Sequence, residues 1–71
     1  MFIVSQTKQQ IVNTECMAAV FVMGKEIKSA SLEVDGTIWV LGTYETDQRV
    51  SQVMQEIWSA YANDQKVYQM P

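Results

Sequence analysis

The clearest pattern of hydrophobic and polar positions lies between residues 46 and 64. Apolar side chains recur there every three or four residues and polar ones fill the opposite side, as in an amphipathic helix. The apolar positions are Val50, Val53, Met54, Ile57, Trp58 and Tyr61. Thr46 stands at an N-cap position, Asp47 complements the helix dipole, and Asn63-Asp64 provides a stop. The pattern predicts a helix over about 47–62 that buries Val50, Val53, Met54, Ile57 and Tyr61 against a sheet.

The remaining chain carries short β patterns separated by polar or glycine-containing turns. Strands are expected near residues 2–5, 10–13, 17–23, 26–34 and 37–43, with a short strand or extended tail at 66–69. Asp35-Gly36 predicts a tight two-residue hairpin, because both residues adopt positive φ at low cost. Ile27 has the opposite parity to Ala30 and Leu32, which predicts a β-bulge near Lys28-Ser29.

Consecutive hairpins followed by a helix predict one α+β domain spanning residues 1–71. We expect an antiparallel sheet of four to five strands in meander order, with the C-terminal helix packed on one face. The strands at 17–23 and 37–43 are apolar on both faces, so one face remains uncovered. Its expected interface residues are Trp39, Leu41, Phe21 and Met23. The alternative is that a strongly bent sheet or the terminal segments enclose this face.

Composition favours an additional source of stability. A chain of 71 residues buries only about 60% of its unfolded surface. Cys16 is the only cysteine and the chain has no histidine, which excludes an internal disulfide and disfavours a structural zinc site. Small domains without these devices often gain stability by associating. The sequence therefore predicts a homo-oligomer, most simply a homodimer, or a complex with a protein partner.

Charge and hydropathy restrict the compartment and the partners. The net charge of −3 and five scattered basic residues argue against nucleic-acid binding. No apolar run reaches membrane-spanning length, and the apolar start of the chain is too short for a signal peptide. A free thiol suits a reducing compartment. We therefore expect a cytoplasmic protein that binds neither nucleic acid nor membrane.

Catalytic and cofactor motifs are not found in the sequence. Without histidine the usual general base near neutral pH is missing, and no phosphate-binding glycine loop or nucleophile elbow occurs. Glu45 and Asp47 are close in sequence, yet acidic residues at a helix start usually complement its dipole. Cys16 has no neighbouring cation to lower its pKa and is expected to be partly buried and inert. The sequence predicts no enzyme, no cofactor, and no catalytic or metal site.

Several phrases carry a resemblance that covers nearly the whole chain. They are F-I-V-S-Q with I-V-N shortly after it, W-V-L-G-T-Y-E-T-D-Q-R-V, and V-Y-Q-M-P at the end. The chain resembles short uncharacterised proteins of Gram-positive bacteria and their phages or integrated elements, which carry V-L-G-x-Y-x-T-x-E-R-A before a helix. Asp47-Gln48-Arg49-Val50 departs from that pattern. The resemblance implies no activity, and it makes Ser5, Gln6, Asn13 and Tyr68 candidates for fold-defining polar contacts.

Two classes of function remain from the sequence. The first is a small non-catalytic protein-interaction or assembly module that self-associates through a sheet face, in a phage or mobile-element setting. The second is a small ligand-binding protein or enzyme that uses a pocket between helix and sheet. The five methionines fit either class, because methionine fills core gaps and also forms adaptable binding surfaces.

Overall fold

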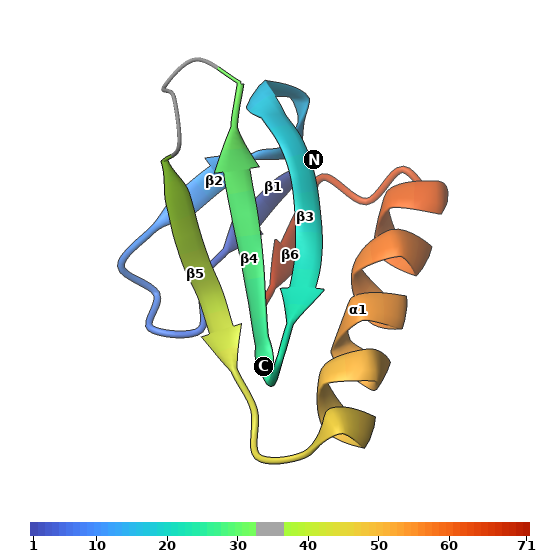
Figure 1. Cartoon of the computed structure of the whole chain (residues 1–71). Coiled ribbons are helices and arrows are strands. Elements are labelled where there is room, and N and C mark those ends of the chain that lie inside the picture. The colour runs from blue at the N-terminus through green and yellow to red at the C-terminus, as the bar shows by residue number, and fades with distance from the viewer. Residues whose placement is uncertain (33–36) are drawn as a thin grey trace.

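The computed structural model describes residues 1–32 and 37–71, over which the chain forms two three-stranded sheets and one α-helix (Figure 1). The elements are, in chain order, β1 (Phe2–Val4), β2 (Ile11–Asn13), the short 3₁₀ helix η1 (Thr14–Cys16), β3 (Met17–Met23), β4 (Glu26–Ser31), β5 (Ile38–Thr43), α1 (Asp47–Ala62) and β6 (Val67–Gln69). The predicted α+β class is confirmed. The predicted Asp35-Gly36 hairpin lies outside the described residues.

The expected single antiparallel sheet is wrong, because the strands divide into two sheets. The front sheet has the order β3-β4-β5 and is an antiparallel meander. The back sheet has the order β2-β1-β6, and β6 runs parallel to β1, with Phe2 paired to Val67 and Val4 paired to Gln69. A parallel pair needs a long crossover. Here the front sheet and α1 together supply that crossover, which local patterns could not reveal.

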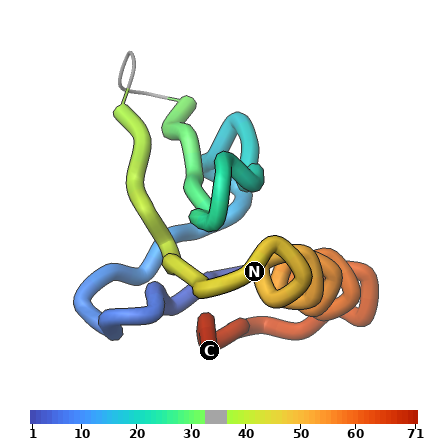
Figure 2. The backbone as a smooth tube through the Cα atoms, turned by 60° about the horizontal axis from the view of Figure 1, so that its bottom comes forward, coloured from blue at the N-terminus to red at the C-terminus, as the bar shows by residue number. Residues whose placement is uncertain are grey.

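Two layers enclose the core. The front sheet forms one layer, and the back sheet and α1 lie side by side in the other (Figure 2). Buried apolar side chains come from both sheets, the helix and the segments that follow them: Ile3, Val12, Ile27, Leu41, Tyr44, Val50, Val53, Ile57, Ala60, Tyr68 and Met70. The helix therefore shares the task of covering the inner face of the front sheet with a second sheet.

The helix begins and ends where the sequence predicts. Thr46 accepts a hydrogen bond from the Arg49 N–H at 3.0 Å, as an N-cap should. The last turn closes through the Gln65 N–H bonded to the Ala60 carbonyl, with Asp64 at φ 56°. This is the Schellman arrangement, with Asp64 in place of the usual glycine. The left-handed residue is thus Asp64, one position after the predicted Asn63.

The buried stripe of α1 differs from the prediction in its last turn. Val50, Val53 and Ile57 are buried as expected, and Met54 is half-buried. Tyr61 was expected in the core but is 54% exposed, whereas Ala60 is 7% exposed. The chain reverses beside this turn and hydrogen-bonds to the Ala60 carbonyl. A small side chain suits this close approach better than the tyrosine ring does.

The predicted bulge is present one position earlier than expected. Ile27 pairs with Gly42 and Lys28 pairs with Val40, so Leu41 is the extra residue, on β5 rather than β4. Leu41 and Gly42 are consecutive and both buried, as happens when a bulge directs two adjacent residues inward. Because the extra residue shifts the alternation of side chains along β5, the bulge also determines which residues of β5 face away from the core.

Candidate interaction surface

The side of the front sheet that faces away from the core forms a continuous surface, called here the outer face. Pairing across the three strands places residues opposite one another in rows, and paired residues share a face. The rows are Ala19, Ala30 and Ile38; Phe21, Lys28 and Val40; and Met23, Glu26 and Thr43. The alternate residues Ile27 and Ser29 are 0% exposed, which identifies their side as the inner one.

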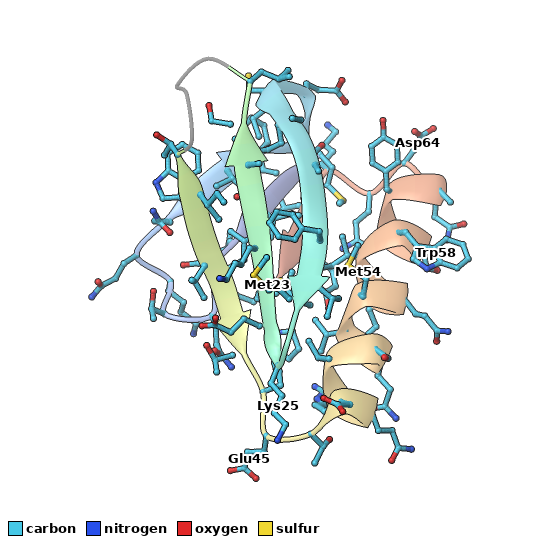
Figure 3. The ribbon with its side chains drawn as sticks, in the orientation of Figure 1. Met23, Lys25, Glu45, Met54, Trp58 and Asp64 are labelled. Carbon is cyan, nitrogen blue, oxygen red and sulfur yellow. The ribbon has the colours of Figure 1, made fainter. Side chains whose placement is uncertain are left out.

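Large apolar side chains are accessible on the outer face. Met23, Ile38 and Val40 are 54%, 50% and 44% exposed, and Phe21 is half-buried among them. Figure 3 shows the Met23 side chain lying across the front of the sheet, on the side away from the second layer. No described element covers this face (Figure 2). A contiguous apolar surface of this kind on a small protein usually marks an interaction site.

Two opposite charges lie within the outer face. The Lys28 ammonium is 3.6 Å from the Glu26 carboxylate and 3.7 Å from the Met23 sulfur. The Thr43 hydroxyl donates to the same carboxylate at 3.4 Å. An exposed pair of this type contributes little to stability. Its consequence is that the apolar surface carries one positive and one negative group side by side and no net charge.

The four residues predicted to form the interface do not share one face. Phe21 and Met23 lie on the outer face, whereas Leu41 is 1% exposed and belongs to the core. Trp39 pairs with the buried Ser29, so it faces inward and is half-buried. Leu41 and Trp39 therefore do not lie on the outer face, to which the prediction assigned them.

The error has a physical cause. The sequence indicated one cover, the helix, so the larger side chains of β5 were assigned to the uncovered side. The back sheet supplies the second cover: β2 residues and Trp39 line a shallow depression of about 270 Å³. Ile38 and Val40 consequently face outward. Their alternation was visible in the sequence, but the side it faced was not.

The polar residues singled out by the resemblance make fold-defining contacts. The Gln6 side-chain amide donates to the carbonyls of Thr43 and Pro71, both at 3.1 Å, and its oxygen accepts from the Thr43 N–H at 2.9 Å. Ser5 Oγ accepts from the Gln10 N–H, and Asn13 accepts from the Glu15 N–H. The Gln6 bonds join the start of the chain to the end of β5 and to the last residue, whereas the Ser5 and Asn13 bonds shape local turns.

A second polar cluster joins β6 to the helix. The Tyr68 hydroxyl donates to the Glu56 carboxylate at 2.7 Å, and Arg49 lies 3.8 Å from the same carboxylate. Burial raises the pKa of Tyr68 well above its ordinary value, and the hydrogen bond to Glu56 adds to the effect. Burial also raises the pKa of Tyr44, whose hydroxyl donates to the Pro71 carbonyl. Both tyrosines are held neutral as hydrogen-bond donors, a structural role.

Reactive groups are dispersed over the described residues. Cys16 was expected to be partly buried, but it is exposed at the end of η1. Residues 1–32 and 37–71 contain no group of three or more His, Cys, Asp or Glu side chains placed to hold a metal ion. Across the same residues, no helix has the length and apolar composition needed to cross a membrane.

Comparison with known proteins finds no family model, curated protein or solved structure that matches this chain. The surfaces of the chain itself are therefore the basis for inferring its function. Of these, the outer face of the front sheet brings the exposed Met23, Ile38 and Val40 together around Phe21 on strands of six and seven residues.

Proposed function

We propose that this chain is a small, non-catalytic protein-interaction module that forms a homodimer through the outer face of the front sheet. The observation that carries the proposal is the cluster of exposed Met23, Ile38 and Val40 around Phe21, with no described layer above it. The resemblance supports a setting in phages or mobile elements, and the free thiol of Cys16 supports a cytoplasmic one.

Two copies fit one another through this face because it is self-complementary. In a two-fold dimer the same surface contacts itself, so every charge must meet a compatible group. Glu26 and Lys28 are two residues apart on the same face of β4, paired across the hairpin with Met23 and Phe21 respectively. A copy turned by a half rotation can place its Glu26 near the first copy's Lys28, while the apolar side chains meet between them. The outer face thus supplies an apolar centre and paired charges.

The small size of the chain favours the same arrangement. A domain of this length has little core, and covering half-exposed aliphatic side chains adds burial that the monomer cannot achieve alone. On the other side of the same sheet, Leu41 and Gly42 at the bulge of β5 are buried and face the core. Association would therefore place the front sheet of a second copy over the outer face, and the fold of each copy would stay the same.

Sedimentation equilibrium from micromolar to millimolar concentration tests the proposal. Val40→Glu should dissociate the dimer, because it forces a charge into a desolvated contact. Ile11→Glu is the matched control: Ile11 is 67% exposed but lies on the back sheet, so this variant should associate like the wild type. A wild-type chain that stays monomeric over the whole range, or one that Ile11→Glu dissociates equally, would contradict the proposal.

A further inference from the structure

The front sheet has a second unprotected feature, the free edge of β3. In the order β3-β4-β5, no described strand pairs with β3 on the side away from β4. Its seven residues, M-A-A-V-F-V-M, include no charge and no proline. Natural edge strands are usually short or carry charges that prevent pairing with another chain. An uncharged edge of this length is therefore suited to accept a further strand.

A groove runs beside this edge. Figures 1 and 2 show α1 lying alongside β3 and beyond it, in the layer that also contains the back sheet. Between them is an open depression of about 300 Å³ whose walls include Met17, Ala18 and Val20 from β3 and Met54, Ile57 and Tyr61 from α1. Met1 also contributes to its lining. The front sheet is thus too narrow to cover α1, and one more strand beside β3 would cover it.

Methionine is concentrated around the groove. Three of the five methionines, Met1, Met17 and Met54, line it. Figure 3 shows Met54 directed from α1 toward the sheet, and Trp58, one turn further along the helix, also contributes to the lining. Unbranched, polarisable methionine side chains adapt to apolar ligands of varied shape. The groove is therefore built to receive apolar side chains.

We propose that an extended peptide segment of a different protein adds to the free edge of β3 as a fourth strand. Its backbone would bond to the N–H and C=O groups that alternate residues of an edge strand direct outward. Every second side chain would enter the groove toward Met54 and Tyr61, while the others continue the outer face. The matching segment is uncharged and apolar at alternate positions, because neither β3 nor the groove wall formed by Met54 and Ile57 offers a charge.

A second copy of this chain does not fit the same edge. If β3 paired with its own symmetry mate, a two-fold axis would lie just outside the strand. The helix extends past that edge (Figure 1), so the helices of the two copies would occupy the same space. A lone peptide strand brings no helix with it. The edge of β3 and the outer face therefore select different partners, and this inference does not depend on the proposed homodimer.

A small polar metabolite is also a poor fit to the groove. The groove includes the Thr14 hydroxyl, but that group already donates to the Met1 carbonyl at 2.9 Å. Tyr61 adds a second hydroxyl and Trp58 an indole N–H, and the other lining side chains are apolar. Small-molecule sites usually place several polar groups to orient the ligand. Here the strand backbone supplies most of the polar contacts, which favours a peptide.

Titration with a capped octapeptide of alternating leucine and threonine tests the inference. We expect saturable binding that shifts the amide resonances of Ala18, Val20 and Val22 and slows their hydrogen exchange. A peptide of the same sequence, N-methylated at alternate residues, should not bind, because it cannot form the strand hydrogen bonds. Absence of saturable binding, or equal binding of the methylated peptide, would overturn the inference.

Two variants separate the groove from the outer face. Met54→Glu should weaken peptide binding by about tenfold or more, because it places a charge against apolar peptide side chains. Val40→Glu lies on the outer face but on β5, the far strand of the sheet, and should leave the affinity unchanged; a melting curve for each variant confirms that it is folded. Equal affinity for Met54→Glu and wild type would overturn the placement. In the Val40→Glu protein, whose outer-face contact is disrupted, exchange protection of Ala18, Val20 and Val22 that rises with protein concentration would instead identify a second copy as the occupant of the edge, and would also overturn the inference.

Discussion

The two sheets of this protein hold their strands in different ways. The back sheet consists of strands of three residues each, and side chains support it: Gln69 donates to the Ser5 carbonyl at 3.2 Å, and Gln6 connects it to the end of β5. The front sheet has strands of six and seven residues, and the side-chain contacts among Met23, Glu26, Lys28 and Thr43 lie on its outer face. Backbone pairing and the buried side chains of Ile27 and Leu41 hold the longer strands.

This difference separates structural surfaces from binding surfaces. In the back sheet, polar side chains are already engaged in contacts between distant parts of the chain, so they have little capacity left for a partner. In the front sheet, apolar side chains such as Ile38 and Val40 remain exposed, and the edge of β3 remains unpaired. Both proposed binding sites therefore lie on the front sheet, whose inner side chains Ile27 and Leu41 are buried in the core while its outer face and the edge of β3 stay accessible.

The largest expected effect comes from truncating a helix residue in the core that the two sheets share. Ile57 is 4% exposed and lies on α1, between the layers. Ile57→Ala should lower the free energy of unfolding by about 2–5 kcal/mol, because it leaves a cavity in the shared core. Urea unfolding monitored by tryptophan fluorescence and by amide exchange in β1 checks this. The two probes should report one coincident transition, since the sheets share one core.

An unchanged melting temperature for Ile57→Ala would show that the inferred packing of α1 is wrong. Ser59→Ala is a suitable control, because this exposed residue lies on the polar side of the same helix. It should change the free energy of unfolding by less than about 0.5 kcal/mol. Separate transitions in the two sheets would contradict the shared core.

The sequence patterns predicted the helix and most strands correctly, but they did not predict how the strands pair into sheets. The limits of α1, the N-cap Thr46 and the strand β3 follow from spacings within a few residues, and the structure confirms them. The parallel pairing of Phe2 with Val67 joins opposite ends of the chain, and no local pattern encodes it. The missing back sheet then reversed the orientation assigned to β5. Leu41 was consequently placed at an interface, although it is a core residue.

The polar contacts were equally hard to predict, because they too join residues far apart in the sequence. Gln6 was marked as a candidate only through the resemblance, and its partners Thr43 and Pro71 are 37 and 65 positions away. The exposure of Tyr61 could not be foreseen from helical spacing either. It depends on the chain reversal that makes Ala60 the buried residue of the last turn. The outer face was predicted in kind, as an uncovered apolar sheet face, but only Phe21 and Met23 were assigned to it correctly.

An intermediate effect is expected at the bulge, which belongs to the front sheet. A Cβ atom at Gly42 would lie 2.6 Å from the Tyr44 hydroxyl oxygen and 3.0 Å from two ring carbons. Tyr44 is 8% exposed and its hydroxyl donates to the Pro71 carbonyl, so the ring cannot move away without losing that bond. Gly42→Ala should therefore cost about 1–3 kcal/mol. Chemical denaturation measures the loss.

The double variant Gly42→Ala, Tyr44→Phe sharpens this test. Removing the hydroxyl eliminates the closest contact and frees the ring from Pro71. The double variant should lose less stability than the sum of the two single variants, since the clash and the hydrogen bond share one ring. Strict additivity would mean that Gly42 is not confined by Tyr44.

The smallest expected effect belongs to the back sheet and depends on pH. Tyr68→Phe removes the hydrogen bond to Glu56, whose side chain is 51% exposed and can be rehydrated, so the cost at neutral pH should be about 1 kcal/mol. In the folded wild type the pKa of Tyr68 is raised above 10.0, so the unfolded chain loses this proton first. The stabilisation is therefore complete below pH 10 and declines as pH rises further. Tyr68→Phe should unfold with a shallower alkaline decline, leaving the share of Tyr44. Urea titrations from neutral pH to above 10 measure both slopes, and parallel slopes for variant and wild type would show that Tyr68 does not couple the back sheet to α1 in this way.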